Sequence, residues 1–355
     1  MKKLFILVLL LGISSINAQR VNNSGSLIQG GLDDGEKLLS AYITPINKAI
    51  VFGLSDVSYT KNKKDADHRL LFSVKLAYVS VPNDDFTYDV SKLNLQHIEA
   101  KDPTKTIAQS VFGDSLKTIT LASKDKDLFG RPLFEFETPG GSQKSALPLP
   151  SLGLTYRMKY TNLSVNVIPY VQVPTSDMMV GMLGFSVQQD LAMFVKGLQG
   201  KNFAISLQGS AAGLYGNADL NVKPDAVTVP VTLTGSHPGP YDNQELDIFY
   251  TSINVGAYAD YALTKSISVF AGGGVNMGSS RILVKGNYPI YTSDPSGSGS
   301  VVADDVTDPL DMSDNFSRAK FEFGARADWN RFYVQLNYNV ATYGGLGLNL
   351  GYKML

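Results

Sequence analysis

The side chains best suited to chemistry in this sequence are charged residues at alternate positions, with apolar residues between them. In residues 318–329 (RAKFEFGARADW), Lys320, Glu322, Arg326 and Asp328 alternate with alanine, phenylalanine and tryptophan. Successive side chains of a β-strand point to opposite faces, so this spacing predicts a strand with one charged and one apolar face. The two pairs of opposite charge are neighbours on that face and are expected largely to neutralise each other.

Other alternating segments carry charges at equivalent positions. If the apolar faces meet lipid, the polar faces line the interior of a closed barrel. Such an interior is either a wet pathway that selects by charge or a salt-bridged filling, and the pattern leaves both open. The residues that we expect to line this lumen are Lys75, Arg157, Lys159, Asp260, Lys320, Glu322, Arg326 and Asp328.

Enzymatic and metal chemistry find little support. None of the three histidines, His68, His97 and His237, lies in a strong strand or near a G-x-S-x-G serine. The chain has no cysteine, so neither disulfides nor a cysteine zinc site can form. The acidic run 304–314 lacks the glycine-centred loop and closing glutamate of a calcium site, so it is interpreted as a solvated outer loop. We therefore expect no enzyme, no cofactor and no bound metal.

Amphipathic strands must position the charged residues. The clearest are 318–329, 331–342 and 346–354, each with one wholly apolar face. Their length suits a tilted strand that crosses the hydrocarbon of a membrane. Further candidate strands are 48–60, 69–82, 152–160, 163–173, 179–189, 203–215, 246–263 and 265–285, with one more strand required within 105–123. The predicted fold is all-β: a transmembrane antiparallel β-barrel of about 12 strands, with a range of about 10–14.

The connections between these strands alternate between short and long. Those at 161–162, 263–265 and 329–331 are very short, whereas 216–245 and 286–316 are long and hydrophilic. Barrels in outer membranes have short periplasmic turns and longer outer loops. With the C-terminus on the periplasmic side, all three short turns lie there and both long loops lie outside.

The N-terminal region has a different pattern. Residues 1–18 combine two lysines, an apolar stretch and a small residue at the cleavage position, which predicts a secretory signal peptide. Residues 19–47 are expected to hold a flexible segment and an amphipathic helix over 33–46, ended by Pro45, that plugs the barrel or closes its mouth. The barrel is expected over 48–355, with 83–150 as an insertion of unresolved pattern. No later stretch is apolar for long enough to form a transmembrane helix.

Three stretches carry a family resemblance: EKLLSAYITPINKAIVFGLSDVSY at 36–59, LPLPSLGLTYRMKYTNLSVNVIPYV at 147–171 and GMLGFSVQQDLAMFVKGL at 181–198. They resemble a family of exported Bacteroidota outer-membrane β-barrel proteins of unknown function. The resemblance implies a barrel location and supplies no catalytic or binding residues. The plan of an N-terminal plug and a closed barrel is also similar to fatty-acid-transporter-type barrels, although a fold does not give a function.

Three functional hypotheses follow for a protein of the outer membrane of a Gram-negative bacterium. The first is a barrel that passes or binds a small amphiphilic solute. The second is a structural or adhesive surface barrel with a filled lumen. The third is a soluble periplasmic β-protein that binds a ligand. The expected partners are outer-membrane lipid and a small solute, while a net charge of −1 gives no reason to expect nucleic acid.

Overall fold

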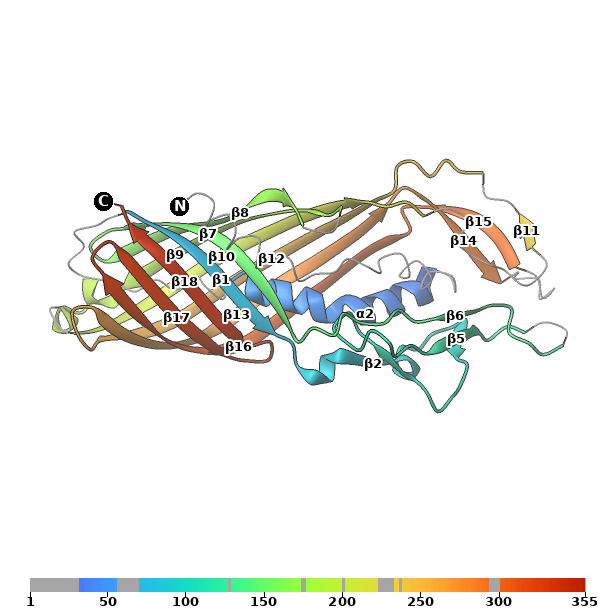
Figure 1. Ribbon diagram of the computed structural model, residues 1–355, viewed down its shortest axis with the longest axis horizontal. Helices are drawn as coiled ribbons and strands as arrows, with labels where there is room; N and C mark the ends of the chain where they lie inside the picture. Colours follow the sequence, from blue (N-terminus) through green and yellow to red (C-terminus); the bar gives the residue numbers. More distant parts are fainter. Residues whose placement is uncertain are drawn as a thin grey trace.

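A closed barrel of ten antiparallel strands forms the body of the molecule (Figure 1). The computed structural model describes residues 32–55, 70–126, 129–173, 177–199, 202–222, 233–235, 238–293 and 301–354. The barrel strands are β1 (Leu70–Ser80), β7 (Ala146–Arg157), β8 (Thr161–Gln172), β9 (Met179–Asp190), β10 (Phe203–Asp219), β12 (Glu245–Ala262), β13 (Ile267–Lys285), β16 (Leu310–Trp329), β17 (Phe332–Val340) and β18 (Gly345–Lys353). β1 pairs with β7 on one side and with β18 on the other, which closes the ring. The predicted all-β antiparallel class is therefore confirmed.

The ten strands lie at the lower end of the predicted range of about 10–14, and the central value of twelve is not confirmed, because two predicted segments form no barrel strand among the described residues. Within the predicted strand 48–60, residues 48–53 belong to the helix α2 (Leu32–Gly53), which runs through Pro45 and takes in the apolar run Ala49–Phe52. Residues 56–60 of that prediction lie outside the described residues. Burial of that run against the barrel wall outweighs its β-branched composition. The segment 105–123 contributes only β4 (Ile107–Gln109) and β5 (Thr120–Ser123), which lie in two small sheets outside the barrel.

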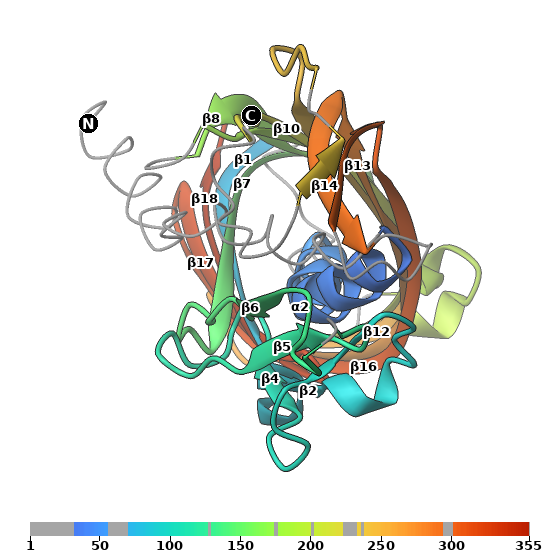
Figure 2. The same ribbon diagram turned by 90° about the vertical axis from the view of Figure 1, so that its right-hand side faces the viewer.

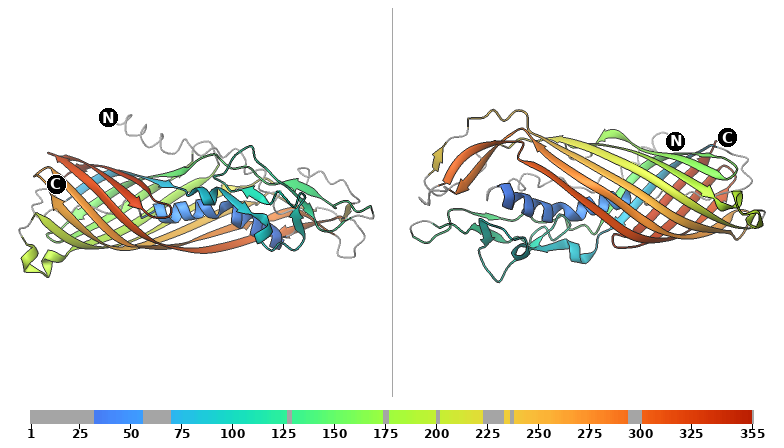
Figure 3. Two further views of the ribbon diagram at one scale, coloured as in Figure 1. Left: turned by 90° about the horizontal axis from the view of Figure 1, so that it is seen from below. Right: turned by 180° about the vertical axis from the view of Figure 1, so that it is seen from behind.

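Four adjacent strands are much longer than the others and form what we call the tall wall. β10, β12, β13 and β16 have 17, 18, 19 and 20 residues. The other six barrel strands have 9 to 12 residues. We call the end with the C-terminus and the short turns the base, and the opposite end the mouth. The tall wall rises beyond the short strands at the mouth, as both views in Figure 3 show.

Two groups of small elements extend from the mouth. Residues 81–145, which we call the insertion, hold η2 (Asn83–Phe86), β2 (Thr87–Asp89), η3 (Val90–Lys92), β3 (Ile98–Ala100), β4, β5 and β6 (Glu135–Glu137). Beyond the tall wall, β14 (Asn287–Ser293) and β15 (Val301–Thr307) pair, and β11 (Leu233–Gly235) joins β15. The predicted outer loop 286–316 thus contains this hairpin and the first residues of β16. At the base, β9 is followed by η4 (Leu191–Met193) and η5 (Lys196–Leu198).

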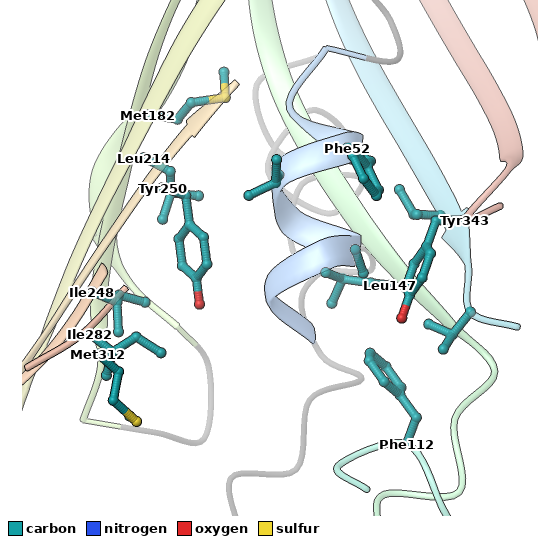
Figure 4. Packing of buried hydrophobic residues seen from close by; sticks show 14 residues of the cluster. Phe52, Phe112, Leu147, Met182, Leu214, Ile248, Tyr250, Ile282, Met312 and Tyr343 are labelled. Atoms are coloured by element: carbon teal, nitrogen blue, oxygen red, sulfur yellow. The ribbon is translucent and has the colours of Figure 1, made fainter. Parts of the chain in front are cut away.

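The helix α2 lies inside the mouth, between the tall wall and the insertion (Figure 2). The half of the helix that ends at Gly53 packs in an apolar cluster with all four strands of the tall wall, with β1 and β7, and with Phe112 of the insertion. Figure 4 shows Phe52 beside Tyr343 on one side of the helix and Tyr250, Ile248 and Met312 on the other. The other half, with Leu38 and Tyr42, packs against β3, β4, β5 and β6. Among the described residues, no helix is long and apolar enough to cross a membrane.

Candidate functional site: a polar lumen under a helical stopper

The two faces of the tall wall exchange character partway along each strand. On β16, Ala319, Phe321 and Phe323 point outward near the base, whereas Asp311 and Ser313 point outward at the mouth. The inward face has the opposite order. It carries Lys320, Glu322, Arg326 and Asp328 near the base and the apolar Leu310 and Met312 at the mouth. The barrel therefore has a polar interior in its base half and an apolar interior in its mouth half.

The outward apolar residues of the base half form a continuous apolar belt around the barrel. Each has more than a third of its surface exposed, which is unusual for so many large apolar side chains on one surface. The belt comprises Leu154, Leu163, Leu183, Phe185, Val187, Leu207, Ile253, Val255, Val275, Met277, Phe321, Phe323, Leu336, Tyr338, Val340 and Leu346, with Tyr156, Phe203, Tyr261, Trp329 and Phe332 at the base. Aromatic side chains at one end of an apolar belt are typical of a lipid–water interface.

Seven of the eight predicted lumen residues point inward and are buried. They are Lys75, Arg157, Asp260, Lys320, Glu322, Arg326 and Asp328, all at most 7% exposed. The prediction is wrong for Lys159, which is exposed in the turn between β7 and β8 with its Nζ over the Tyr160 ring. The predicted strand 152–160 continues the alternation to Lys159, but β7 ends at Arg157.

The charges of β16 are paired on the inward face near the base of the lumen. Arg326 donates to both carboxylate oxygens of Asp328, at 3.0 and 3.1 Å, and Lys353 of β18 reaches the same carboxylate at 2.8 Å. The Lys320 ammonium lies 3.5 Å from Glu322, whose carboxylate also accepts from the Tyr258 hydroxyl at 3.2 Å. Lys353 was missed as a lumen residue, although the alternation of β18 places it on the polar face. These pairs tie β12, β16 and β18 together through the lumen.

Three aromatic rings of the lumen lie over glycines directly across the strand pairing. Tyr258 pairs with Gly272, Phe270 with Gly324 and Tyr333 with Gly351. A Cβ at each of these glycines would overlap the ring of its partner. The ring of Tyr333 in turn lies 3.7 Å from the Arg326 guanidinium. Glycine at these positions therefore lets the rings lie along the wall and hold the arginine in place.

Lys75 occupies a less satisfied part of the lumen, on β1. Its side chain is 1% exposed and its Nζ has no hydrogen-bond partner among the described residues. A Cβ at Gly153 would lie 2.8 Å from Lys75 Cε and 3.0 Å from Asn166 Oδ1, so these groups crowd over the same glycine. Asn349, directly across the pairing from Lys75, has both amide atoms unpaired. This side of the lumen is thus polar, buried and incompletely hydrogen-bonded.

The mouth is closed by the C-terminal end of α2. The last carbonyls of a helix lack partners within the helix, and here the wall supplies them. The Phe52 carbonyl accepts from Arg318 Nη2 at 3.3 Å and from Asn276 Nδ2 at 3.4 Å. One turn earlier, the Asn47 side chain accepts from the Tyr250 hydroxyl at 2.8 Å. The helix is therefore fastened by polar contacts to β12, β13 and β16 as well as by its apolar packing.

Tyr343, in the turn between β17 and β18, joins three parts of the mouth. Its hydroxyl donates to Asp85 of the insertion, and Lys48 of α2 lies 3.3 Å from the same carboxylate. The Tyr343 side chain is almost fully buried against Phe52. Burial, with the hydrogen bond to Asp85 adding to it, holds the pKa of the Tyr343 phenol well above its usual range. The junction therefore depends on a protonated tyrosine.

The opposite end of α2 is fixed to the insertion by one carboxylate. Asp34 is completely buried and accepts hydrogen bonds from three consecutive backbone amides, those of Gln96, His97 and Ile98, at 2.7 to 3.1 Å. Three converging N–H groups satisfy a buried carboxylate without a cation. The first turn of the helix is also where a negative charge is favourable.

The other predicted candidates have separate positions. His97 is exposed in the insertion, whereas His68 and His237 lie outside the described residues. The carboxylates of the acidic run 304–314 do not converge on one site. Asp305 accepts hydrogen bonds from the Gly239 backbone amide and the Tyr241 hydroxyl. Asp311 forms an ion pair with Arg281. The run is thus partly structured and not a simple solvated loop.

These features define a closed ten-stranded barrel with a polar, cross-linked lumen and a helical stopper at its mouth. A family model described as "Family of unknown function (DUF6588)" matches residues 1–354, and the chain belongs to that family. This agrees with the resemblance to a family of unknown function, while the Bacteroidota origin stays a prediction. No curated protein matches the chain.

Three solved structures with some similarity are each very distant in sequence. The attachment invasion locus protein Ail of Yersinia pestis, solved with the heparin analogue sucrose octasulfate, is 9% identical over 80% of this chain and 98% of that chain, with a TM-score of 0.27. The translocator domain of the autotransporter NalP from Neisseria meningitidis is 10% identical over 89% and 97%, with a TM-score of 0.33. The Pseudomonas putida toluene transporter TodX is 10% identical over 87% and 72%, with a TM-score of 0.28. Values this low carry no statement about what this chain binds or does.

Proposed function

We propose that this protein is an outer-membrane β-barrel with a filled lumen, and that it holds a folded module at the cell surface. The observation that carries the proposal is the exchange of faces along the tall wall. The base half has the outward apolar belt that lipid requires, and the mouth half has the apolar interior and polar exterior of a water-exposed domain. The module consists of the mouth half of the tall wall, α2 and the insertion.

The contents of the lumen support a structural barrel better than an open pore. The ion pairs of Arg326, Asp328 and Lys353 occupy the inward face at the base and link β16 to β18, and the apolar cluster around Phe52 fills the mouth. Buried ion pairs with several hydrogen bonds hold a structure in one arrangement, because breaking one leaves an uncompensated charge. The belt also disfavours a soluble periplasmic protein, whose apolar faces would be buried. We propose export by the predicted signal peptide, residues 1–18, which lie outside the described residues.

Two substitutions on the outward face of β16 test the proposal. Both Phe323 and Asn315 are exposed on the outward face of β16. Phe323 lies in the belt, and Asn315 lies eight residues closer to the mouth. Phe323→Arg is expected to cost about 2–4 kcal/mol in the membrane and to block insertion, while Asn315→Arg is expected to insert normally. The readouts are membrane fractionation and the mobility shift on heating in a denaturing gel. Equal behaviour of the two variants contradicts the placement in lipid.

A second candidate function is passage of a small amphiphilic solute, and the lumen around Lys75 favours it. Its ammonium and the Asn349 amide are buried with unused hydrogen-bonding capacity, as expected of groups that meet water or a solute. Single-channel recording of the wild type and of Arg318→Ala, which loosens α2, separates the two candidates. Conductance that appears in the variant supports passage, and its absence from both supports the filled barrel.

A further inference from the structure

A row of aromatic side chains lies on the outer surface of the barrel, just beyond the apolar belt. The Tyr170 and Tyr215 rings are nearly parallel, with centroids 6.1 Å apart and planes 9° apart. The Phe249 ring follows, 4.9 Å from that of Tyr215. The row has members on β8, β10 and β12. On β12, Thr251 lies between Phe249 and Ile253 of the belt, and its hydroxyl is 2.8 Å from that of Ser279 on β13. These rings therefore lie above the edge of the belt, where the surroundings are polar.

The backbone is shaped to bring Tyr170 into this row. The pairing of β8 with β9 shifts between Ile168 and Val171, so Tyr170 lies in a β-bulge. A bulge re-aims a side chain relative to the regular alternation. On β9, a Cβ at Gly181 would lie 3.1 Å from Tyr170 Cδ2, so the ring rests on the glycine and leans toward Tyr215. Half of the Tyr170 surface nevertheless stays exposed, at 50%.

The phenol hydroxyls are fixed by a polar network on the mouth side of the row. Tyr170 donates to Asn217, whose amide donates to Glu245 at 3.1 Å. Tyr215 donates to Asp247 at 2.9 Å, and Lys285 forms an ion pair with the same carboxylate. Fixed hydroxyls make the rings rigid before any ligand arrives, and such preorganisation lowers the entropy lost on binding. A ring that only anchors the barrel in lipid needs no such network.

The chemistry of this surface suits a sugar. A pyranose ring presents an apolar C–H face that packs on an aromatic ring, and its rim of hydroxyls needs donors and acceptors at the edge. Here the Lys285 ammonium is about half exposed beside the rings, and Glu245 has a carboxylate oxygen beyond the one that Asn217 uses. We propose that the row of Tyr170, Tyr215 and Phe249 binds the saccharide headgroup of a glycolipid in the outer leaflet. This inference rests on the proposed placement of the belt in the outer membrane.

The test uses the full-length protein in detergent micelles and, as the probe, deacylated lipopolysaccharide, which has the saccharide without the acyl chains. Saturation-transfer NMR and titration measure its binding. Tyr170→Ala and Tyr215→Ala are expected to weaken binding at least about tenfold, since each removes a stacking ring. Tyr215→Phe keeps the stacking ring and loses only the hydroxyl that fixes it, so it should weaken binding less than Tyr215→Ala does. The matched control is Tyr338→Ala, which removes an outward ring that pairs with Phe323 inside the belt.

The outcomes separate this inference from the proposed function. The saccharide site is supported if binding is lost in the alanine variants, is weakened less in Tyr215→Phe than in Tyr215→Ala, and is unchanged in Tyr338→Ala. No binding by the wild type, or the same loss in Tyr338→Ala as in Tyr170→Ala, overturns the saccharide site. Membrane fractionation of Phe323→Arg and Asn315→Arg reports on the barrel placement independently. A correctly inserted barrel that does not bind the saccharide defeats only the inference.

Discussion

The guanidinium of Arg318 on β16 lies over the ring of Phe52, the penultimate residue of α2, at 4.5 Å from its centroid. The same side chain donates to the Phe52 carbonyl and to the backbone carbonyls of Thr342 and Tyr343. One cation thus contacts the end of the helix, the wall and the turn between β17 and β18. A positive charge at a helix C-terminus also interacts favourably with the helix dipole.

We expect Arg318→Ala to increase the local opening of α2 more than the removal of an exposed charged side chain from the tall wall does. The loss of charged hydrogen bonds to buried carbonyls costs about 2 kcal/mol, or roughly a 30-fold faster hydrogen exchange in residues 46–53. Arg281→Ala is the control, because its ion pair with Asp311 is more than half exposed on both sides and such pairs contribute about 0–1 kcal/mol. Unchanged exchange in Arg318→Ala would show that apolar packing alone holds the helix.

Gly351→Ala is expected to destabilise the base of the lumen. The added methyl would overlap the Tyr333 ring, which packs on Arg326, so ring and guanidinium must both move. Such overpacking costs about 1–3 kcal/mol and lowers the midpoint of urea unfolding. Gly209→Ala, where a Cβ meets nothing within 4 Å, should leave the midpoint unchanged. Equal midpoints for the two variants would show that the Tyr333 ring can move to a second position without loss of stability.

Asp34 and Asp33 are adjacent in the first turn of α2 and differ in burial, which makes them a matched pair. Asp34→Ala leaves three backbone amides of the insertion without an acceptor and is expected to cost about 2–4 kcal/mol. The exposed Asp33, changed to alanine, should cost well under 1 kcal/mol. Hydrogen exchange at residues 96–98 reports the difference directly. Slow exchange there in Asp34→Ala would contradict the role of the carboxylate.

The Tyr343 junction predicts a loss of order in the mouth at alkaline pH. A folded-state pKa above the unfolded value means that the protonated phenol stabilises the fold. That contribution is complete below the unfolded pKa of about 10 and is lost as pH rises toward the folded value. The chain has no native cysteine, so a spin label on Glu36→Cys reports the mobility of α2 alone. We expect the label to become more mobile above pH about 10.

The experiment needs a background without the phenol. Tyr343→Phe keeps the ring against Phe52 and the ion pair of Lys48 with Asp85. In Tyr343→Phe the label should be slightly more mobile at neutral pH, because the hydrogen bond to Asp85 is lost. Its mobility should then change less as the pH rises. An identical alkaline transition in both proteins would show that the Tyr343 phenol is not its cause.

The sequence was most informative where one face of a strand is uniformly apolar. Alternation in 318–329 placed Glu322, Arg326 and Asp328 on the inward face because side chains of a strand alternate whatever the neighbouring residues are. It failed at Ala49–Phe52, where contact with distant strands decides between helix and strand. It also could not show the exchange of faces: Leu310 and Met312 are inward like Lys320, but only the arrival of α2 makes an apolar interior favourable there.

The position of α2 has a consequence for the order of assembly. The helix precedes β1 in the chain, yet the donors that fasten it belong to strands made much later. They are the Tyr250 hydroxyl of β12, the Asn276 amide of β13 and the Arg318 guanidinium of β16. Its docking surface therefore does not exist until the tall wall has paired. Until then, the apolar face of the helix and the apolar interior of the mouth are uncovered, and both are accessible to chaperones and proteases. Docking of α2 can therefore occur only after the barrel strands have paired. A chain whose last strands fail to pair keeps these apolar faces uncovered.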